Sequence, residues 1–202
     1  MKTLTLLISL FFFFSLIGQN QSDKTQIVTT LNNYVDGFYK GDTTKLKKTI
    51  KADKSHQPKV STYYLIRHAE KDRSNKTNQD PHLNKTGKKR AKDWADYFKD
   101  VKFDAIYSTN YNRTKETATP TAKSKNLDIQ FYDPSDFSLE EFTSKTKGKT
   151  VLIVGHSNTT PMFTNGLLGT QKYKDMADDD NTKLFKVTIT KDKKSSEVLS
   201  IK

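Results

Sequence analysis

The chain has 202 residues, a formal net charge of +12 and no cysteine. Without cysteine the protein has no disulfide framework, no thiol nucleophile and no thiolate metal ligand. The 35 basic residues are spread over nearly every segment rather than gathered with aromatic residues, so the sequence does not predict a nucleic-acid partner. The positive field instead favours small anionic ligands.

The first residues have the pattern of a signal peptide. A basic start is followed by an apolar run from Leu4 to Ile17 and then by polar residues. A run of about 14 apolar residues is short for a membrane span and typical of a signal peptide. We expect this segment, residues 1–20, to be removed near Gly18–Gln21, which leaves no stable membrane insertion. Because Asn-x-Thr sequons fall inside the motifs described below, where a glycan would block them, we expect export to a bacterial periplasm or the exterior.

Residues 21–54 are predicted to form a helical N-terminal appendage. Their apolar side chains fall on one helical face: Ile27, Leu31, Val35 and Phe38. Gly41-Asp42 then interrupts the pattern, and Leu46 and Ile50 mark a second short helix. The role of this segment stays open, and binding of a partner is one alternative.

Residues 55–202 are predicted to form one domain in which strands and helices alternate. The predicted strands are 60–66, 103–107, 129–132 and 150–154, and a C-terminal β-pair is predicted at 184–190 and 197–201. The predicted helices are 85–99, 113–124, a short helix opened by a capping box at Ser138 and Glu141, and 160–168. This alternation predicts an α/β fold, a three-layer α/β/α arrangement with a mostly parallel central sheet.

Three predicted strands end in polar signatures. They are Arg67-His68-Ala69-Glu70, Ser108-Thr109 with Arg113 just beyond, and Gly155-His156-Ser157-Asn158. Ligands in such sheets bind beyond the carboxyl ends of the strands. The chain has only four arginines against 31 lysines, and two of the four lie at these strand ends. Because a guanidinium is a planar fork of donors that fits two phosphate oxygens, the pattern predicts a phosphate site built from two arginines and two histidines.

Four motifs in order give the chain its resemblance to a known family. They are RHAE at 67–70, LNKTGKKRA at 83–91, STNYNRTKETA at 108–118 and VGHS at 154–157. The sequence resembles the histidine phosphatase superfamily, whose fold is phosphoglycerate mutase-like, from Val60 to the C-terminus. Ala69 stands where the hallmark Arg-His-Gly has glycine.

The resemblance implies a role for each of the four residues. His68 would attack phosphorus and carry the phosphoryl group, and a backbone carbonyl would be needed to fix its tautomer. Arg67, Arg113 and His156 would hold the phosphoryl oxygens and stabilise charge during transfer. These fixed groups make a metal or other cofactor unnecessary. His56 and His82 lie outside the motifs and are expected on the surface, with no zinc site.

The general acid is less well defined by sequence. In the acid phosphatase and phytase branch an Asp follows the second histidine, and Ser157 stands there instead. The mutase-like branch has an acid after the third strand, which makes Asp133 the first choice. Glu70 is the second choice, and Asp136 and Glu140 remain open.

We therefore expect a metal-independent phosphomonoesterase that acts on a small phosphorylated substrate through phosphohistidine on His68. The RHAEK form resembles lipopolysaccharide core heptose phosphatases, and the compact size resembles small phosphohistidine phosphatases. Two alternatives remain: a non-catalytic phosphate- or polyanion-binding module, and a phosphoglycerate-type mutase, for which the domain leaves little room to retain an intermediate.

Overall fold

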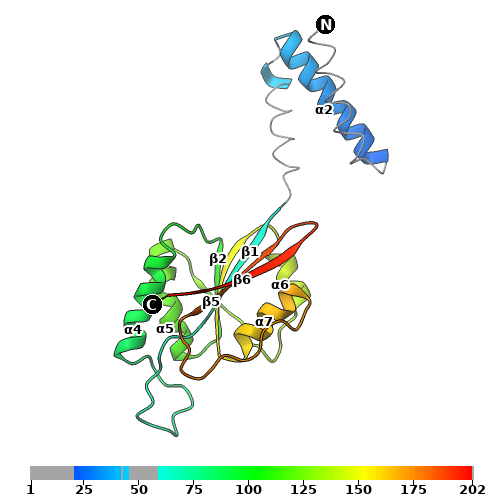
Figure 1. Ribbon diagram of the computed structural model, residues 1–202. Helices are drawn as coiled ribbons and strands as arrows, with labels where there is room; N and C mark the ends of the chain where they lie inside the picture. The colour runs from blue at the N-terminus through cyan, green and yellow to red at the C-terminus, as the bar shows by residue number, and fades with distance from the viewer. Residues whose placement is uncertain (1–20, 42, 46–58, 202) are drawn as a thin grey trace. The chain divides into compact units, whose positions relative to one another are not determined.

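The computed structural model describes residues 21–41, 43–45 and 59–201. The chain divides into two compact units, Met1–Gln57 and Pro58–Lys202 (Figure 1). The predicted signal peptide of residues 1–20 and the second short helix predicted at Leu46 and Ile50 lie outside the described residues. The site predicted from the motifs belongs entirely to the second unit.

The first unit contains one long helix, α2 (Gln21–Tyr39), as the apolar face predicted. Within it Ile27 and Leu31 are half-buried, whereas Phe38 is exposed and stacks on Tyr34 with 5.9 Å between the ring centroids. Gly41 follows the helix with a φ of +68°, a left-handed conformation that glycine adopts without strain. In the part of the chain that the structure describes, no helix combines the length and apolar character that a membrane span requires.

The second unit is built on one six-stranded sheet with the order β3-β2-β4-β1-β5-β6. The strands are β1 (Ser61–Arg67), β2 (Ala105–Ser108), β3 (Ile129–Phe131), β4 (Thr150–Gly155), β5 (Lys183–Ile189) and β6 (Lys194–Ser200). The pairs β3–β2, β2–β4 and β4–β1 are parallel, and β5 and β6 continue the sheet beyond β1 as antiparallel strands. The mostly parallel sheet and the C-terminal β-pair are confirmed.

Helices cover both faces of this sheet. They are α4 (Lys85–Tyr97), α5 (Asn112–Lys125), α6 (Leu139–Lys145) and α7 (Thr159–Leu168). Figure 1 shows α4 and α5 on one side of the strands and α6 and α7 on the other. Each side has its own apolar cluster, because successive side chains of a strand point to opposite faces. Leu65 of β1 packs on the side of α6 and α7, and Ile66 on the side of α4 and α5, so the predicted three layers are confirmed.

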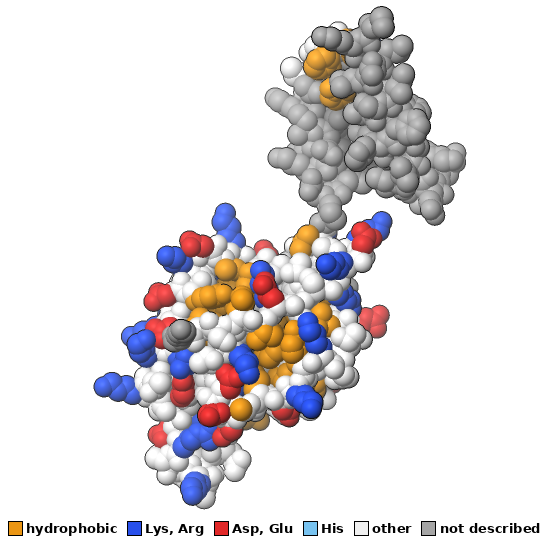
Figure 2. All heavy atoms as spheres, viewed as in Figure 1, with side chains coloured by type: hydrophobic (Ala, Val, Ile, Leu, Met, Phe, Trp, Pro, Cys, Tyr) orange, Lys and Arg blue, Asp and Glu red, His pale blue; other side chains and the backbone are white. Residues whose placement is uncertain are grey.

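Two helix predictions with local detail also hold. Ser138 caps α6, since its side chain accepts a hydrogen bond from the backbone N–H of Glu141 at 3.2 Å. Pro120 lies inside α5, and the helix nevertheless runs through it without interruption. On the face of the second unit seen in Figure 2, basic and acidic side chains are interspersed.

Helix α4 begins in direct contact with the chain that leaves β1. The side chain of Asn84 accepts a hydrogen bond from the N–H of Gly87 at 2.9 Å, and the backbone N–H of Asn84 donates to the carbonyl of Glu70 at 3.0 Å. A Cβ atom on Gly87 would lie 2.1 Å from the Glu70 carbonyl oxygen. Further along this helix Trp94 is fully buried and stacked on Phe98.

Candidate active site

His68 lies just beyond the carboxyl end of β1 and is 4% exposed. Its backbone N–H donates to the carbonyl of Gly155 at 2.9 Å, which fixes the residue beside the end of β4. Its Nδ1 lies 2.7 Å from the carbonyl oxygen of Ala69. A carbonyl can only accept, so Nδ1 carries the proton and Nε2 keeps its lone pair. The backbone carbonyl that we expected to fix the tautomer of His68 is therefore present, and it belongs to Ala69.

The surroundings of His68 keep its imidazole neutral. Burial lowers its pKa to about 3, and the positive charges of Arg67 and Arg113 and the neighbouring His156 act in the same direction. The hydrogen bond to Ala69 opposes the shift without cancelling it. A neutral imidazole with a free Nε2 is a nucleophile at pH 7.

His156 follows β4 and faces the first histidine, with 5.5 Å between the two ring centroids. Its Nε2 lies 2.9 Å from the hydroxyl oxygen of Thr109. That hydroxyl donates to Thr114 at 3.0 Å, and Thr114 in turn donates to the carbonyl of Thr109 at 2.8 Å. Thr109 therefore accepts from His156, which places the proton on Nε2.

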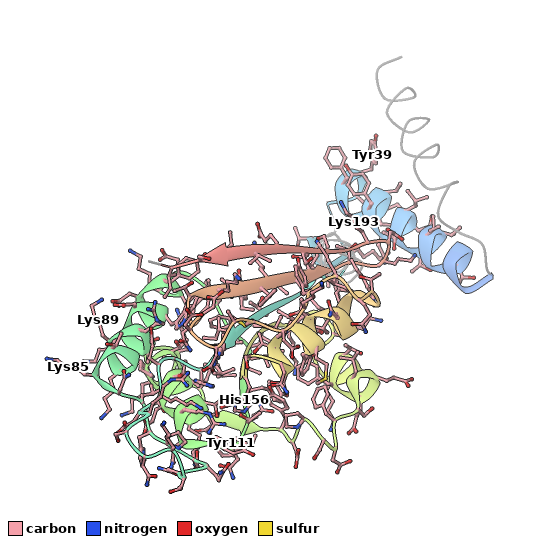
Figure 3. All side chains as sticks on the ribbon, turned by 60° about the horizontal axis from the view of Figure 1, so that its bottom comes forward. Tyr39, Lys85, Lys89, Tyr111, His156 and Lys193 are labelled. Carbon is pink, nitrogen blue, oxygen red and sulfur yellow. The ribbon has the colours of Figure 1, made fainter. Side chains whose placement is uncertain are left out.

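The Nδ1 atom of His156 faces a cation. Nη2 of Arg113 lies 3.5 Å from it, and the ring of Tyr111 packs edge-on against the imidazole; Figure 3 shows Tyr111 and His156 side by side. Burial is the largest of the causes that lower the pKa of His156 to about 4. The positive charges of Arg113, Arg67 and Lys71 act in the same direction. Both histidines are therefore neutral at pH 7.

Arg113 is in the first turn of α5 and reaches back to the sheet edge. Its guanidinium lies over the ring of Tyr111, 4.5 Å from the centroid, a favourable cation–π geometry. Its Nη1 is 3.6 Å from a carboxylate oxygen of Asp80. Nε of Arg113 is buried and has no hydrogen-bond partner in the described part of the chain.

Arg67 ends β1 and is 2% exposed. Its Nη1 donates to the carbonyl of Ala177 at 2.7 Å, and its Nη2 donates to the carboxylate of Asp178 at 2.9 Å. The same carboxylate bonds Arg73 at 2.8 Å, and these two arginines, Arg73 more than Arg67, lower the pKa of Asp178 to about 2. Among the described residues no acceptor pairs with the buried Nε of Arg67.

The structure thus brings together the four residues that the strand ends predicted: Arg67, His68, Arg113 and His156. We call them the basic cluster. Two buried guanidinium Nε–H groups without partners among the described residues, together with the unprotonated Nε2 of His68, suit an anion that must be both held and attacked. Two cavities open beside the cluster. One of about 440 Å³, the His68 cavity, is lined by His68, Lys71 and Asp178 among others, and one of about 900 Å³, the His156 cavity, by Arg113, His156 and Asp133 among others.

The two predicted acids lie in different cavities. Asp133 lines the His156 cavity, and its exposed carboxylate accepts bonds from the hydroxyl and N–H of Ser135, which lower its pKa. Glu70 lines the His68 cavity, and Nε of Arg90 donates to its two oxygens at 2.8 and 2.9 Å. Both carboxylates are already hydrogen-bonded to side chains, and neither contacts the basic cluster through a hydrogen bond or ion pair that the described residues show.

The other candidates from the sequence lie away from the cluster. His82 is exposed, as expected, and pairs with Glu116. Asp136 and Glu140 line neither of the two cavities, and His56 lies outside the described residues. Sequence reasoning missed Thr109 as the partner of His156, and Tyr111 and Asp178 as partners of the arginines. For Asp178 the available signal was the acidic run at 178–180, which stands out in a lysine-rich chain.

Comparison with protein families agrees with the resemblance that the sequence motifs indicated. The family model described as histidine phosphatase superfamily (branch 1) matches residues 63–134, from β1 past β3. Over these residues the chain is similar to the histidine phosphatase superfamily. A search of curated proteins gave no match.

Solved structures share the fold at low sequence identity. A candidate phosphohistidine phosphatase, SixA, from Agrobacterium tumefaciens is 21% identical with a TM-score of 0.53, covering 70% of this chain and 99% of that one. A candidate α-ribazole-5′-phosphate phosphatase from Escherichia coli is 14% identical with a TM-score of 0.57, covering 70% and 96%. Phosphoglycerate mutase from Bacillus anthracis is 17% identical with a TM-score of 0.55, covering 70% and 93%.

Proposed function

We propose that this protein is a metal-independent phosphomonoesterase that hydrolyses small phosphorylated substrates through a phosphohistidine on His68. One observation carries the proposal. The imidazole of His68 is buried, held by Ala69 with Nε2 unprotonated, and faces His156 within a cluster that contains two arginines, Arg67 and Arg113, whose Nε atoms are both buried. This arrangement supports nucleophilic attack on a bound phosphoryl group rather than anion binding alone.

The proposed reaction has two steps. Nε2 of His68 forms a bond to phosphorus while the ester P–O bond breaks and the leaving oxygen takes a proton. Water then attacks the phosphohistidine, which releases inorganic phosphate and restores the imidazole. The unpartnered Nε–H groups of Arg67 and Arg113 would bind the phosphoryl oxygens as charge develops. Fixed cations supply the charge stabilisation that a metal ion provides in other phosphoryl-transfer enzymes.

Hydrolysis is favoured over mutase activity and over binding without turnover. The two cavities are open, so water can reach a phosphoenzyme, whereas a mutase must shield it. A pure binding module would need the arginines but not a nucleophile with a fixed tautomer. The solved structures of this fold include proteins described as phosphatases and a mutase, so they agree with either activity. We also propose that the enzyme is exported, on the basis of the signal-peptide pattern in residues 1–20.

The test is hydrolysis of 4-nitrophenyl phosphate in the presence of EDTA. We expect the wild-type protein to turn over and the His68→Ala variant to lose activity by about a thousandfold or more, since removing a nucleophile leaves only binding effects. His82→Ala is the matched control, because His82 is exposed and outside the site, and it should stay within about twofold of wild type. Equal rates for wild type and His68→Ala would refute the nucleophile, and rates restored only by added metal would refute metal independence.

A second measurement separates the enzyme from the binding module. Brief mixing with a radiolabelled phosphate monoester should leave a phosphoenzyme that is labile in acid and stable in base, the behaviour of a phosphoramidate. The label should be absent from His68→Ala. Phosphate binding by the wild-type protein without turnover or label would instead identify a binding module.

A further inference from the structure

A third, smaller pocket lies next to the His156 cavity, and the proposed reaction steps do not use it. It has a volume of about 180 Å³ and is lined in part by α6 and α7, which cover the same face of the sheet (Figure 1). Six of the eight described residues that line it are apolar or aromatic: Tyr132, Pro134, Phe137, Leu139, Met162 and Phe163. The other two, Thr159 and Gly166, carry no charge. We call it the apolar pocket.

Three aromatic rings in mutual contact form part of the wall of the apolar pocket. The centroid of Phe137 lies 4.6 Å from that of Phe163 and 5.5 Å from that of Tyr132. Phe163 is buried in the apolar cluster on this side of the sheet, so packing fixes the position of its ring. An apolar cavity of roughly 150 Å³ is enough to hold a benzene ring. The apolar pocket therefore has room for a group of that size.

The apolar pocket and the His156 cavity share part of their lining. Tyr132, Pro134 and Thr159 line both. The hydroxyl of Thr159 accepts a hydrogen bond from the backbone N–H of His156 at 3.0 Å, and the backbone N–H of Tyr132 donates to the carbonyl of Ser108, at the end of β2, at 3.1 Å. The shared wall is therefore bonded directly to the backbone of a residue of the basic cluster.

The two cavities beside the basic cluster suit different parts of a substrate. Every described residue that lines the His68 cavity is polar or charged, whereas the His156 cavity presents the exposed rings of Tyr111 and Phe131. The attacking and leaving atoms lie in line across phosphorus. Because His68 lines the first cavity and not the second, we expect the leaving group on the side of the His156 cavity, which adjoins the apolar pocket.

We propose that the substrate is the phosphate monoester of an apolar alcohol or phenol, whose alkyl or aryl group binds in the apolar pocket. The inference rests on the proposed function and names the substrate class for the same site. The basic cluster holds the phosphoryl group, and burial of the apolar group adds binding free energy in proportion to its area. A sugar phosphate fits poorly, because its hydroxyl groups would face aromatic rings instead of hydrogen-bond partners.

Met162 is the specificity-determining residue that is best suited to a test. It is 54% exposed, the most exposed residue of the described lining, so the fold tolerates its replacement. Met162→Gln keeps a side chain of similar length without charge, but it places an amide at the pocket wall. The amide must lose water when an apolar group binds beside it, which weakens the binding of that group.

The experiment measures the Kd of n-alkylphosphonates, from ethyl to octyl, by titration calorimetry. Their P–C bond is not hydrolysed, and only the apolar area varies along the series. We expect the Kd for wild type to fall about fourfold for each methylene that enters the apolar pocket and to level off when the pocket is full. Inorganic phosphate should compete with every member. For the matching n-alkyl phosphates, whose alcohols differ little in basicity, kcat/KM should rise in parallel.

The variants locate the alkyl chain. In Met162→Gln we expect less than about a twofold change in Kd per methylene. Val198→Thr is the matched control, since Val198 is an exposed apolar residue on β6 that lines none of the three cavities described, and it should keep the wild-type dependence. Phe131→Gln alters the wall of the His156 cavity instead, and should reduce the dependence less than Met162→Gln does.

Two results would overturn the inference. A wild-type Kd that changes by less than about 1.5-fold per methylene over the whole series would show that no apolar group is bound. A wild-type dependence that Met162→Gln leaves intact would place the chain outside the apolar pocket, and its loss in Phe131→Gln would assign it to the wall of the His156 cavity. Failure of the proposed function is distinguishable from both: the expected dependence of Kd without turnover of any phosphate ester would refute catalysis while supporting the ligand class.

Discussion

The two histidines of the basic cluster carry an electrostatic cost in the folded state. Burial and the neighbouring guanidinium groups hold the pKa of His68 at about 3 and that of His156 at about 4. In the unfolded chain each histidine has a pKa of about 6.5. At a pH between the folded and the unfolded pKa, the two histidines bind protons in the unfolded chain but not in the folded protein. The free energy of unfolding therefore falls as the pH falls below about 6.5.

This difference predicts a steep pH dependence of stability. Going from pH 7 to pH 5 should lower the free energy of unfolding by on the order of 2 kcal/mol for each of the two histidines. Urea unfolding followed by circular dichroism at the two pH values measures the change. His156→Asn should remove about half of the histidine contribution, whereas His82→Ala, at an exposed position, should leave the pH dependence unchanged. A dependence as steep in His156→Asn as in wild type would contradict the neutral, buried state of His156.

For single residues, the sequence was enough to predict the functional side chains at strand ends but not their hydrogen-bond partners. Arg67, His68 and His156 could be predicted because each follows an apolar run, and parallel strands bring such positions to one edge. The acceptor of Arg67 could not be predicted, because Asp178 lies 111 residues further along the chain. It also belongs to a segment without helical or strand periodicity. Thr109 was visible as part of a motif, but its bond to His156 depends on how β2 and β4 are paired.

Among the elements, α4 has the closest relation to the site. Its first turn is tied to the backbone of Glu70 through Asn84, and Gly87 allows the helix to approach that backbone. The glycine of the LNKTGKKRA motif is therefore explained by contact between two backbones. The same contact supports the chain that leaves β1 and carries His68.

Adding one methyl group at this contact should disturb both stability and catalysis. A Cβ at position 87 would meet the Glu70 carbonyl oxygen at 2.1 Å, which forces the helix or the chain after β1 to move. We expect Gly87→Ala to lower the free energy of unfolding by about 1–3 kcal/mol, the usual range for overpacking, and to reduce kcat on 4-nitrophenyl phosphate. The exposed neighbour Lys88→Ala is the control for helix propensity. Equal midpoints of urea unfolding for the two variants would show that α4 is free to shift.

Element order and type were predictable because each strand and helix has its own periodicity. Helix α5 was predicted despite Pro120, and the structure keeps it continuous. The ends were less certain: β2 begins at Ala105 rather than Phe103, because Phe103 packs in the apolar cluster as part of the preceding loop. Apolar character marks burial, which loops and strands share, so the first hydrogen-bonded residue of a strand does not follow from it.

The whole molecule consists of two units, and the apolar clusters of the described residues all lie in the second. Both clusters that line the sheet are formed by residues from Tyr63 onward, and the basic cluster lies in the same unit. The long helix α2 belongs to the other unit. The second unit therefore contains both the apolar clusters that line the sheet and the residues of the proposed chemistry.

A shortened chain of residues 59–202 should keep its activity. We expect its kcat/KM on 4-nitrophenyl phosphate to lie within about twofold of the full chain, because every described contact of the basic cluster comes from within this range. Steady-state kinetics of the two proteins at equal ionic strength provide the comparison. A loss above about tenfold would mean that the N-terminal unit contributes to the site, and the partner-binding alternative for that unit would then need a catalytic role.

The burial of Trp94 against Phe98 has a practical consequence, because this indole is the chain's one tryptophan. Its intrinsic fluorescence originates in the helix that supports the chain carrying His68, and residues 1–57 contribute none of it. Emission excited selectively at tryptophan therefore reports on the interior of the second unit alone. A red shift of the tryptophan emission on heating would mark the temperature at which water enters that interior, independently of any change in α2.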